Sequence, residues 1–466
     1  MESYESNQSW NEKCAVVGVF NIKKSALLCY YALFAMQHRG QESSGISTSD
    51  GHKITTIKGE GLVTSVFDNT LEKLEGNASI GHNRYSTAGE DSKCDMQPIF
   101  AKYSLGEIAL AHNGNLVNAK EVRDDLITKG AIFQSHLDTE NLIHLIARSD
   151  KSRLRDRITE SLSYLKGAYS FVLLSRGKLF AIRDKFGFRP LSLGEIINDD
   201  GTKGFVVASE SCAFDLIGAK FIRDVNPGEM LIFSVDSSDC DASFESIQVF
   251  PPTPKHCIFE FVYFARPDSV IFNKKSVYEI RKNMGIELAK EHNIKADFVI
   301  PVPDSGVIAA LGYAQESKIP FEFGIVRNHY IGRTFIEPTQ KSRELKVKLK
   351  LNPIEKLIQN KDIIIIDDSV VRGTTSKQII SILRKAGARK VHLVIASPQT
   401  ISPCYYGVDT PDSKHLICAN KNIDEVCEFI GADSLHFLSL NGLYKSIGIE
   451  NGDGYCKACF DREYVI

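Results

Sequence analysis

The sequence has 466 residues, 43% of them hydrophobic, and its 56 Lys and Arg residues against 58 Asp and Glu give a net charge of −2. This length predicts roughly two to four domains, and the even charge balance argues against a nucleic-acid-binding protein that works through bulk positive charge. No apolar stretch approaches the roughly 20 residues of a membrane-spanning helix, so we expect neither nucleic acid nor a membrane as a partner.

The eleven cysteines are scattered from Cys14 to Cys459. An odd number spread over a long chain is not typical of a secreted disulfide framework and indicates reduced thiols with metal-binding or catalytic duties. The residues ahead of Cys14 are polar and rich in Glu, so they match neither a signal peptide nor an Arg-rich presequence. We therefore expect a cytoplasmic protein.

Residues 14–250 are predicted to form an α+β layered domain. Two segments, Leu27 to Gln37 and Thr139 to Ala147, have the apolar spacing of helices. The polar stretch from Val235 to Ser246, followed by the prolines at 251–254, is the predicted linker. The strand-like apolar runs of this domain are AVVGVF from Ala15, SFVLLS from Ser170, GFVVAS from Gly204 and EMLIFS from Glu229.

Residues 255–400 show a different pattern, in which continuous apolar strands alternate with helical stretches. This alternation predicts a parallel sheet in a doubly wound α/β domain. The strands are expected at Phe298 to Val302, Phe321 to Val326, Ile363 to Ile366 and Val391 to Ser397.

The stretch IIIIDDSVVRGTTS, from Ile363 to Ser376, predicts an anion site. A buried strand runs into two acids, then into a hydroxyl-rich loop and a helix. A helix N-terminus offers free N–H groups to a phosphate, and the acids Asp367 and Asp368 suit ribose hydroxyls and Mg²⁺. An ordinary strand–turn–helix with an acidic turn is the alternative. The residues placed to cradle the phosphate are Gly373, Thr374, Thr375 and Ser376.

This stretch resembles the phosphoribosyl pyrophosphate signature of the phosphoribosyltransferases, which adds Ser369 and Arg372 to the binding residues. The loop VPDSG, Val302 to Gly306, resembles the pyrophosphate loop of that family. The resemblance implies that Asp304 contacts the substrate and that Ser305 joins Asp367 and Asp368 at the Mg²⁺.

The polar segment from Arg327 to Gln340 looks like the flexible catalytic loop of the same family. Arg327 and Arg333 would then close over the leaving pyrophosphate, although the composition alone also fits a solvated surface loop. Lys348 and Lys350 alternate as on a strand. They form either an anion site for a substrate or regulatory nucleotide, or a solvated face.

Cys14 opens an apolar strand, and polar patches downstream fit the needs of amide hydrolysis. Arg84 can clamp a carboxylate and Asp138 can accept an ammonium group, while Asn113 and Gly114 can hold an oxyanion. No histidine general base is evident. The α-amine of an N-terminal cysteine, with an ordinary pKa of roughly 7.7–8.0, can take the thiol proton. This chemistry requires cleavage after Lys13; taken alone, Cys14 also fits a buried packing residue.

These patches resemble the glutaminase domain of the N-terminal nucleophile hydrolases, with residues 1–13 as a propeptide. The two halves together resemble the glutamine phosphoribosylpyrophosphate amidotransferase family. The resemblance implies formation of 5-phosphoribosylamine from glutamine and phosphoribosyl pyrophosphate, with release of glutamate and pyrophosphate, as the first committed step of de novo purine biosynthesis. It also implies a homotetramer and feedback inhibition by purine nucleotides. The alternative is a purine-sensing regulatory protein that retains only the ligand-binding fold.

The motif CKAC, Cys456 to Cys459, is half of a tetrahedral metal site, which zinc or an iron–sulfur cluster could occupy. One subclass of the same family carries a [4Fe–4S] cluster. By position, Cys257 and Cys404 would be the other two ligands. Residues 401–466 would then form a C-terminal cluster-binding segment packed on the second domain. Core packing is the expectation for the remaining cysteines, Cys29, Cys94, Cys212, Cys240, Cys418 and Cys427.

Overall fold

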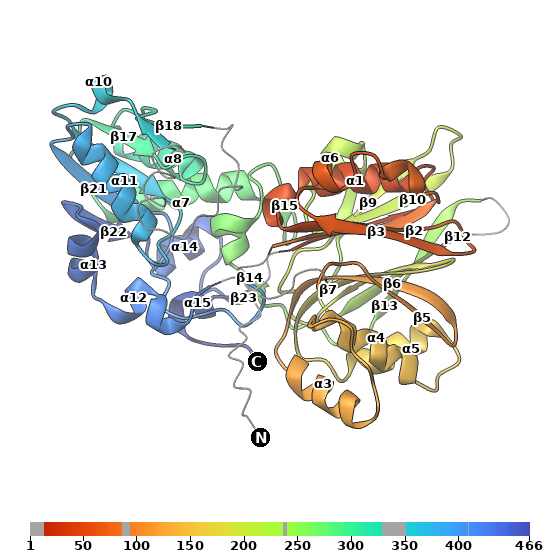
Figure 1. Cartoon of the computed structure of the whole chain (residues 1–466). Helices are drawn as coiled ribbons and strands as arrows, with labels where there is room; N and C mark the ends of the chain where they lie inside the picture. Colours follow the sequence, from red (N-terminus) through yellow and green to blue (C-terminus); the bar gives the residue numbers. More distant parts are fainter. Residues whose placement is uncertain (1–13, 86–93, 236–239, 329–350, 409) are drawn as a thin grey trace.

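The structure is a computed structural model that describes residues 14–85, 94–235, 240–328, 351–408 and 410–466. Two bodies lie side by side: one is built on two stacked sheets, and the other on a smaller sheet wrapped by helices (Figure 1). No helix in these ranges is long and apolar enough to cross a membrane.

The first body contains two antiparallel sheets. The seven-stranded sheet has the order β11-β9-β10-β1-β4-β2-β3, and the six-stranded sheet has the order β13-β12-β8-β7-β6-β5. The strands of the larger sheet are β1 (Ala15–Phe20), β2 (Ser43–Ser49), β3 (Ile54–Glu60), β4 (Ala78–Arg84), β9 (Ser192–Ile197), β10 (Lys203–Ala208) and β11 (Lys220–Asp224). Those of the smaller sheet are β5 (Ile99–Tyr103), β6 (Gly106–Leu116), β7 (Gly167–Ser175), β8 (Leu179–Arg183), β12 (Glu229–Val235) and β13 (Ala242–Gln248).

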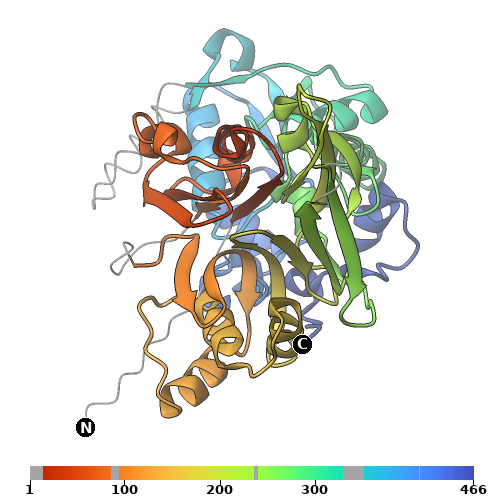
Figure 2. The same ribbon diagram turned by 90° about the vertical axis from the view of Figure 1, so that its right-hand side faces the viewer.

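Helices cover the outer faces of both sheets, which gives a four-layer α-β-β-α domain (Figures 1 and 2). The larger sheet is covered by α1 (Ser25–Ala35), α2 (Val63–Val66) and α6 (Cys212–Ile217), and the smaller by α3 (Ala119–Thr128), α4 (Thr139–Arg148) and α5 (Leu154–Leu162).

The layering explains why β1 is apolar at every position. Val16 and Phe20 point into the core between the sheets, whereas Ala15, Val17 and Val19 pack under α1 on the opposite face. A strand buried on both faces reads as a continuous apolar run. The predicted strands at Ala15, Ser170, Gly204 and Glu229 and both predicted helices are confirmed, as β1, β7, β10, β12, α1 and α4.

The linker prediction for Val235 to Ser246 is wrong over much of its length. β13 pairs with β12 from Val235↔Ala242 to Glu229↔Gln248. Ala242 is buried and Phe244 half-buried, but the alternate residues Ser243 and Glu245 are exposed. An edge strand with one solvated face reads as a polar segment, so its sequence is similar to that of a linker.

The second body is a doubly wound α/β domain, which confirms the predicted fold class. Its parallel sheet has the order β17-β20-β21-β22, formed by β17 (Phe298–Pro301), β20 (Asp362–Asp367), β21 (Lys390–Ile395) and β22 (Ser434–Phe437). One face packs on α7 (Val277–Glu291), α8 (Val307–Ser317) and α14 (Leu440–Ile447). The other packs on α10 (Glu355–Ile358), α11 (Thr374–Lys385) and α13 (Ile423–Ile430).

The segment Phe321 to Val326 does not form the predicted strand of this sheet. It touches β17 through a single bridge, Val299↔Phe321, and then leaves it, with Phe323 57% exposed. Its end forms β18 (Ile325–Arg327), which pairs antiparallel with β19 (Leu351–Pro353) in a separate ribbon. Without apolar cover on both faces, this run cannot remain in a buried parallel sheet.

Short elements close the space between the two bodies. β14 (His256–Cys257) pairs in parallel with β23 (Tyr455–Cys456), which ties the C-terminal segment to the start of the second body. The Tyr406 ring stacks on Phe188 of the first body with centroids 4.4 Å apart. Residues 401–466 therefore contact both bodies. The other short elements are β15 (Val270–Ile271), β16 (Lys275–Ser276), α12 (Ile417–Asn420) and α15 (Ala458–Asp461).

Candidate active sites

Cys14 directly precedes β1 and is fully buried. The β1–β4 register pairs Ala15 with Asn83, so Arg84 occupies the next position beside Cys14. The Arg39 Nε donates to the Cys14 carbonyl oxygen at 3.1 Å. The structure therefore brings Arg84 next to the predicted nucleophile and adds Arg39, for which the sequence alone suggests no role.

Asn113 and Gly114 lie on β6, in the sheet that faces β1. The Asn113 amide donates to the Ser209 hydroxyl at 3.3 Å, and that hydroxyl accepts the Val16 N–H at 2.9 Å. Gly114 has φ +149°, and a Cβ there would lie 2.1 Å from the Ala168 carbonyl oxygen. The candidate oxyanion residues are thus tied to the nucleophile strand through Ser209, which no sequence motif had singled out.

Arg84 and Asp138 are both 6% exposed, and they are linked through Asp95. Arg84 Nη1 donates to the Asp95 carbonyl oxygen at 2.8 Å, and the Asp95 carboxylate accepts the His136 N–H, also at 2.8 Å. His136 is two residues from Asp138. A guanidinium and a carboxylate are therefore both held in the buried region around β4 and β6, as recognition of an amino acid requires.

Asp138 also faces His112, one residue before Asn113. The two side chains lie 3.2 Å apart, and the second Asp138 oxygen accepts the Leu116 N–H at 2.8 Å. Burial alone would raise the pKa of Asp138, but the His112 ring and these hydrogen bonds outweigh it and hold the pKa below its ordinary value. The carboxylate is therefore ionised at neutral pH, as an ammonium-binding group must be.

The second site lies at the carboxyl ends of β17 and β20, which pair up to Pro301↔Ile366. Their following loops leave the same edge of the sheet, where ligands bind in open α/β folds. Ser305 Oγ lies 3.4 Å from an Asp367 oxygen. A Cβ at Gly306 would lie 2.2 Å from the Ile366 carbonyl oxygen, so only glycine fits between the two strand ends. The structure thus joins the two predicted loops.

Asp367 and Asp368 are each 7% exposed. Burial and the neighbouring Asp368 carboxylate raise the pKa of Asp367 well above its ordinary value. Ser369 Oγ donates to Asp368 at 2.6 Å. Two adjacent buried carboxylates repel each other unless a cation or protons compensate them.

The hydroxyl-rich loop ends at Gly373, which has φ +72° and precedes α11. Ser376 is buried in the first turn, whereas Arg372, Thr374 and Thr375 are exposed. Arg327 forms an ion pair with Asp304 across the mouth of the site. Three other predicted residues, Arg333, Lys348 and Lys350, lie outside the described ranges.

The four predicted cluster cysteines line a single cavity. Cys257 and Cys456 are register partners in the β14–β23 pair, and Cys404 and Cys459 complete the set. Burial raises the pKa of Cys257 to about 12 and that of Cys459 well above its ordinary value. The remaining lining is apolar and comprises Phe188, Phe259, Tyr406, Val408 and Ala458.

The loop after Cys404 packs directly on the candidate oxyanion strand. The Asn115 side chain donates to the Tyr405 carbonyl oxygen at 2.9 Å. A Cβ at Gly407 would lie 3.0 Å from the Gly114 carbonyl carbon. No sequence pattern linked these segments, because they are distant along the chain and belong to different domains.

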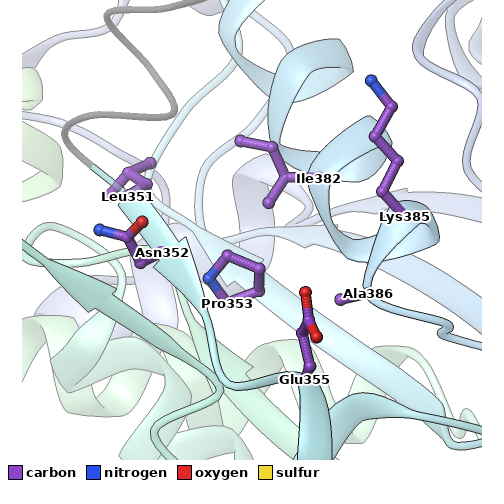
Figure 3. Close-up of a pocket in the computed structure, with 7 residues that line it drawn as sticks. All are labelled: Leu351, Asn352, Pro353, Glu355, Ile382, Lys385 and Ala386. Carbon is purple, nitrogen blue, oxygen red and sulfur yellow. The ribbon is translucent and has the colours of Figure 1, made fainter.

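A further cavity lies between β19 and the C-terminal part of α11 (Figure 3). It contains none of the predicted site residues and is at the opposite end of α11 from Ser376. Its lining comprises Leu351, Asn352, Pro353, Glu355, Ile382, Lys385 and Ala386.

The fold and the two sites define a class of protein: a glutamine amidotransferase domain joined to a phosphoribosyltransferase domain. Residues 82–215 match the glutamine amidotransferase domain family, and residues 270–412 match the phosphoribosyl transferase domain family.

The relatives are similar over the whole chain. An amidophosphoribosyltransferase of Rhizobium etli is 49% identical over 95% of this chain and 88% of its own length. The chloroplastic amidophosphoribosyltransferase 2 of Arabidopsis thaliana is 47% identical, over 98% and 80% respectively. The solved glutamine phosphoribosylpyrophosphate amidotransferase of B. subtilis, complexed with ADP and GMP, superposes with a TM-score of 0.89 at 44% identity and covers 97% of both chains.

The chain belongs to the amidophosphoribosyltransferase family. It is an enzyme that transfers nitrogen from glutamine to phosphoribosyl pyrophosphate in purine biosynthesis. The alternative of a regulatory protein without enzymatic activity receives no support from these relatives.

Proposed function

We propose that the reaction runs in two steps at the two sites described above. In the first, the Cys14 thiolate attacks the glutamine amide carbon, and Asn113 with the Gly114 N–H stabilises the oxyanion. The thiol proton passes through the Cys14 α-amine to the departing ammonia, and water then releases glutamate. Arg84 and Asp138 hold the two charged ends of glutamine. In the second step, ammonia attacks C1 of phosphoribosyl pyrophosphate and pyrophosphate leaves.

The observation that carries the first step is the arrangement around β1. Cys14 directly precedes β1, the neighbouring strand β4 places Arg84 beside it, and Ser209 ties Asn113 to β1 through Val16. The free α-amine requires removal of residues 1–13. Intact-mass measurement of glutaminase-active protein tests this: we expect a chain that begins at Cys14. An active chain that still carries Met1 to Lys13 would exclude the α-amine mechanism.

We propose that Mg²⁺ binds at Ser305, Asp367 and Asp368. The support is the meeting of two buried carboxylates with a hydroxyl at the sheet edge, because Mg²⁺ prefers oxygen ligands and commonly joins substrate phosphates. When bound, it would neutralise charge on the pyrophosphate. We expect D367N to raise the Mg²⁺ concentration needed for half-maximal activity about tenfold or more; an unchanged requirement would remove Asp367 from the site.

We propose a [4Fe–4S] cluster at Cys257, Cys404, Cys456 and Cys459, where it would hold the C-terminal segment in place. All four line one apolar cavity, yet among the described residues no group of three or more His, Cys, Asp or Glu side chains is placed to hold a metal ion. Thiolates around a zinc ion converge to about 2.3 Å from one point, whereas a cluster has a wider core. Iron and sulfide analysis of anaerobically purified protein tests this; zinc without iron would refute it.

We also propose inhibition by purine nucleotides, a homotetramer and a cytoplasmic location. The relative solved with ADP and GMP supports the first. Family resemblance supports the second. For the third, no disulfide joins any of the cysteines in the described residues, and a reducing compartment would protect both Cys14 and the cluster. Inhibition assays with AMP, ADP and GMP test the first proposal. Light scattering tests the homotetramer, and cell fractionation tests the cytoplasmic location.

A further inference from the structure

Arg189 is a buried cation between the cysteine cavity and the region around Cys14. Its side chain is 2% exposed, yet in the described part of the chain its Nε and Nη2 atoms have no hydrogen-bond partner. Leaving a buried donor unsatisfied costs about 1–3 kcal/mol, and more for a charged group. A native site that retains two such donors indicates an acceptor in the working protein.

One edge of the guanidinium faces the cavity of the four cysteines. Arg189 Nη1 lies 3.9 Å from the Cys257 sulfur, and a thiolate at Cys404 would be close enough to raise the pKa of Arg189. A Cβ at Gly407 would lie 3.2 Å from the unpaired Nη2. Gly407 stands between Tyr406 and Val408, two residues of the cavity wall. The unpaired Nη2 is therefore next to the segment that carries two residues of the cavity wall.

The same Nη1 also connects the guanidinium to the region of the nucleophile. Arg189 Nη1 donates to Glu260 at 3.0 Å. Glu260 is fully buried in a π-helical turn, Glu260–Phe264, and its carboxylate accepts two bonds from Arg39, at 2.7 and 3.0 Å. Arg39 in turn holds the Cys14 carbonyl oxygen. An unbroken buried chain of ion pairs thus runs from the cysteine cavity to the main chain of Cys14.

We propose that Arg189 is a positioning residue that joins the cluster to the glutaminase site. It donates from Nη2 to a sulfur of the bound cluster and from Nη1 to Glu260, whose carboxylate fixes Arg39 and thereby Cys14. The inference rests on the cluster proposed above. A cation and an N–H donor at the sulfurs favour the more negative, reduced cluster, since net charge and hydrogen bonds to sulfur set cluster potentials.

The test compares Arg189→Met and Arg189→Lys with the parent enzyme, all purified anaerobically with the cluster in place. We expect R189M to shift the one-electron reduction equilibrium, followed by electron paramagnetic resonance, at least tenfold toward the oxidised form, which is about 59 mV. We also expect its glutaminase kcat to fall about tenfold, with a smaller change in KM. R189K keeps the positive charge but loses the forked guanidinium donors. Its reduction equilibrium and its kcat should therefore lie between those of R189M and the parent enzyme.

Arg157→Met is the matched control. Arg157 is also buried and donates to main-chain carbonyls such as that of Lys151, but it lies on α5, beyond the opposite sheet. The Arg157→Met variant should leave the reduction potential of the cluster unchanged. Parent enzyme without iron would refute the cluster and with it this inference. Iron-loaded R189M with the parental potential and kcat would overturn the role of Arg189 alone. If R189M does not fold, R189K supplies the same two measurements.

Discussion

Gly407, in the C-terminal segment, lies against two residues of the first domain. Its φ is +92°, and an added Cβ would press on Gly114 and on Arg189. We expect Gly407→Ala to lower glutaminase kcat about tenfold, because the displaced Gly114 N–H no longer meets the oxyanion. Steady-state glutamate release measures this.

Gly431→Ala is the matched control for the substitution at Gly407. Gly431 also has a left-handed φ, +82°, but nothing lies within 4 Å of its missing Cβ. Both variants therefore carry the cost of a left-handed alanine, about 1 kcal/mol in the free energy of unfolding. Only G407A should lose kcat; equal kcat values in the two variants would show that the contact with Gly114 is catalytically irrelevant.

Single residues were predictable from the sequence where a local pattern carried them. Cys14 opens an apolar strand, and Asp367 and Asp368 end one, so their positions followed from alternation and strand ends. Arg189 and Glu260 form their contact 71 residues apart in sequence, and neither lies in a recognisable motif. A buried ion pair formed by tertiary packing leaves no periodic signal, so this part of the site required the structure.

The loop that leads into α4 is held by one carboxylate, that of Glu140. Glu140 lies in the first turn of α4. Its carboxylate accepts hydrogen bonds from the Gln134 and Ser135 N–H groups of the preceding loop, both at 2.9 Å. Burial opposes ionisation, but the hydrogen bonds from His144 and this loop outweigh it and lower the pKa of Glu140 to about 2. The folded pKa is thus below the ordinary value, so this stabilisation is present above about pH 4.5 and is lost as the pH falls toward 2.

We therefore expect Glu140→Gln to lower the free energy of unfolding at pH 7 by on the order of 3 kcal/mol. The deficit should shrink as the pH falls below 4.5, and urea unfolding at pH 7 and pH 3.5 measures both values. Asp125→Asn is the control, since Asp125 is an exposed carboxylate paired with Lys129 at 2.7 Å and surface pairs contribute little. A deficit independent of pH would contradict the assignment.

At the level of elements, prediction succeeded where burial was uniform. β1 and β20 are buried on both faces, and their apolar runs identified them. β13 was not predicted as a strand because its outer face is exposed to solvent. The segment Phe321 to Val326 was placed in the wrong sheet because an apolar sequence does not show whether both faces of the strand are buried. Tertiary context, rather than local propensity, decided both cases.

For the whole molecule, the two sites should be separable by their nitrogen source. We expect Cys14→Ser to abolish glutamine-driven synthesis of phosphoribosylamine but to retain synthesis from added ammonia, because the second site needs only free NH₃. Asp367→Asn should impair both reactions. Pyrophosphate release with either nitrogen donor measures this; loss of the ammonia-driven reaction in C14S would mean that Cys14 also acts beyond glutamine hydrolysis.

The contact of Gly407 with Gly114 also has a consequence for the order in which the protein matures. Ribosomes make the glutaminase half first, and its sheets can close once β13 has emerged. The strand that bears Gly114 nevertheless lacks its contact with Gly407, and the cysteine cavity lacks Cys456 and Cys459, until the C-terminal segment has been synthesised. We therefore expect a chain that ends before this segment to be a poor glutaminase, so that glutamine is spared until the domain that uses its nitrogen is complete.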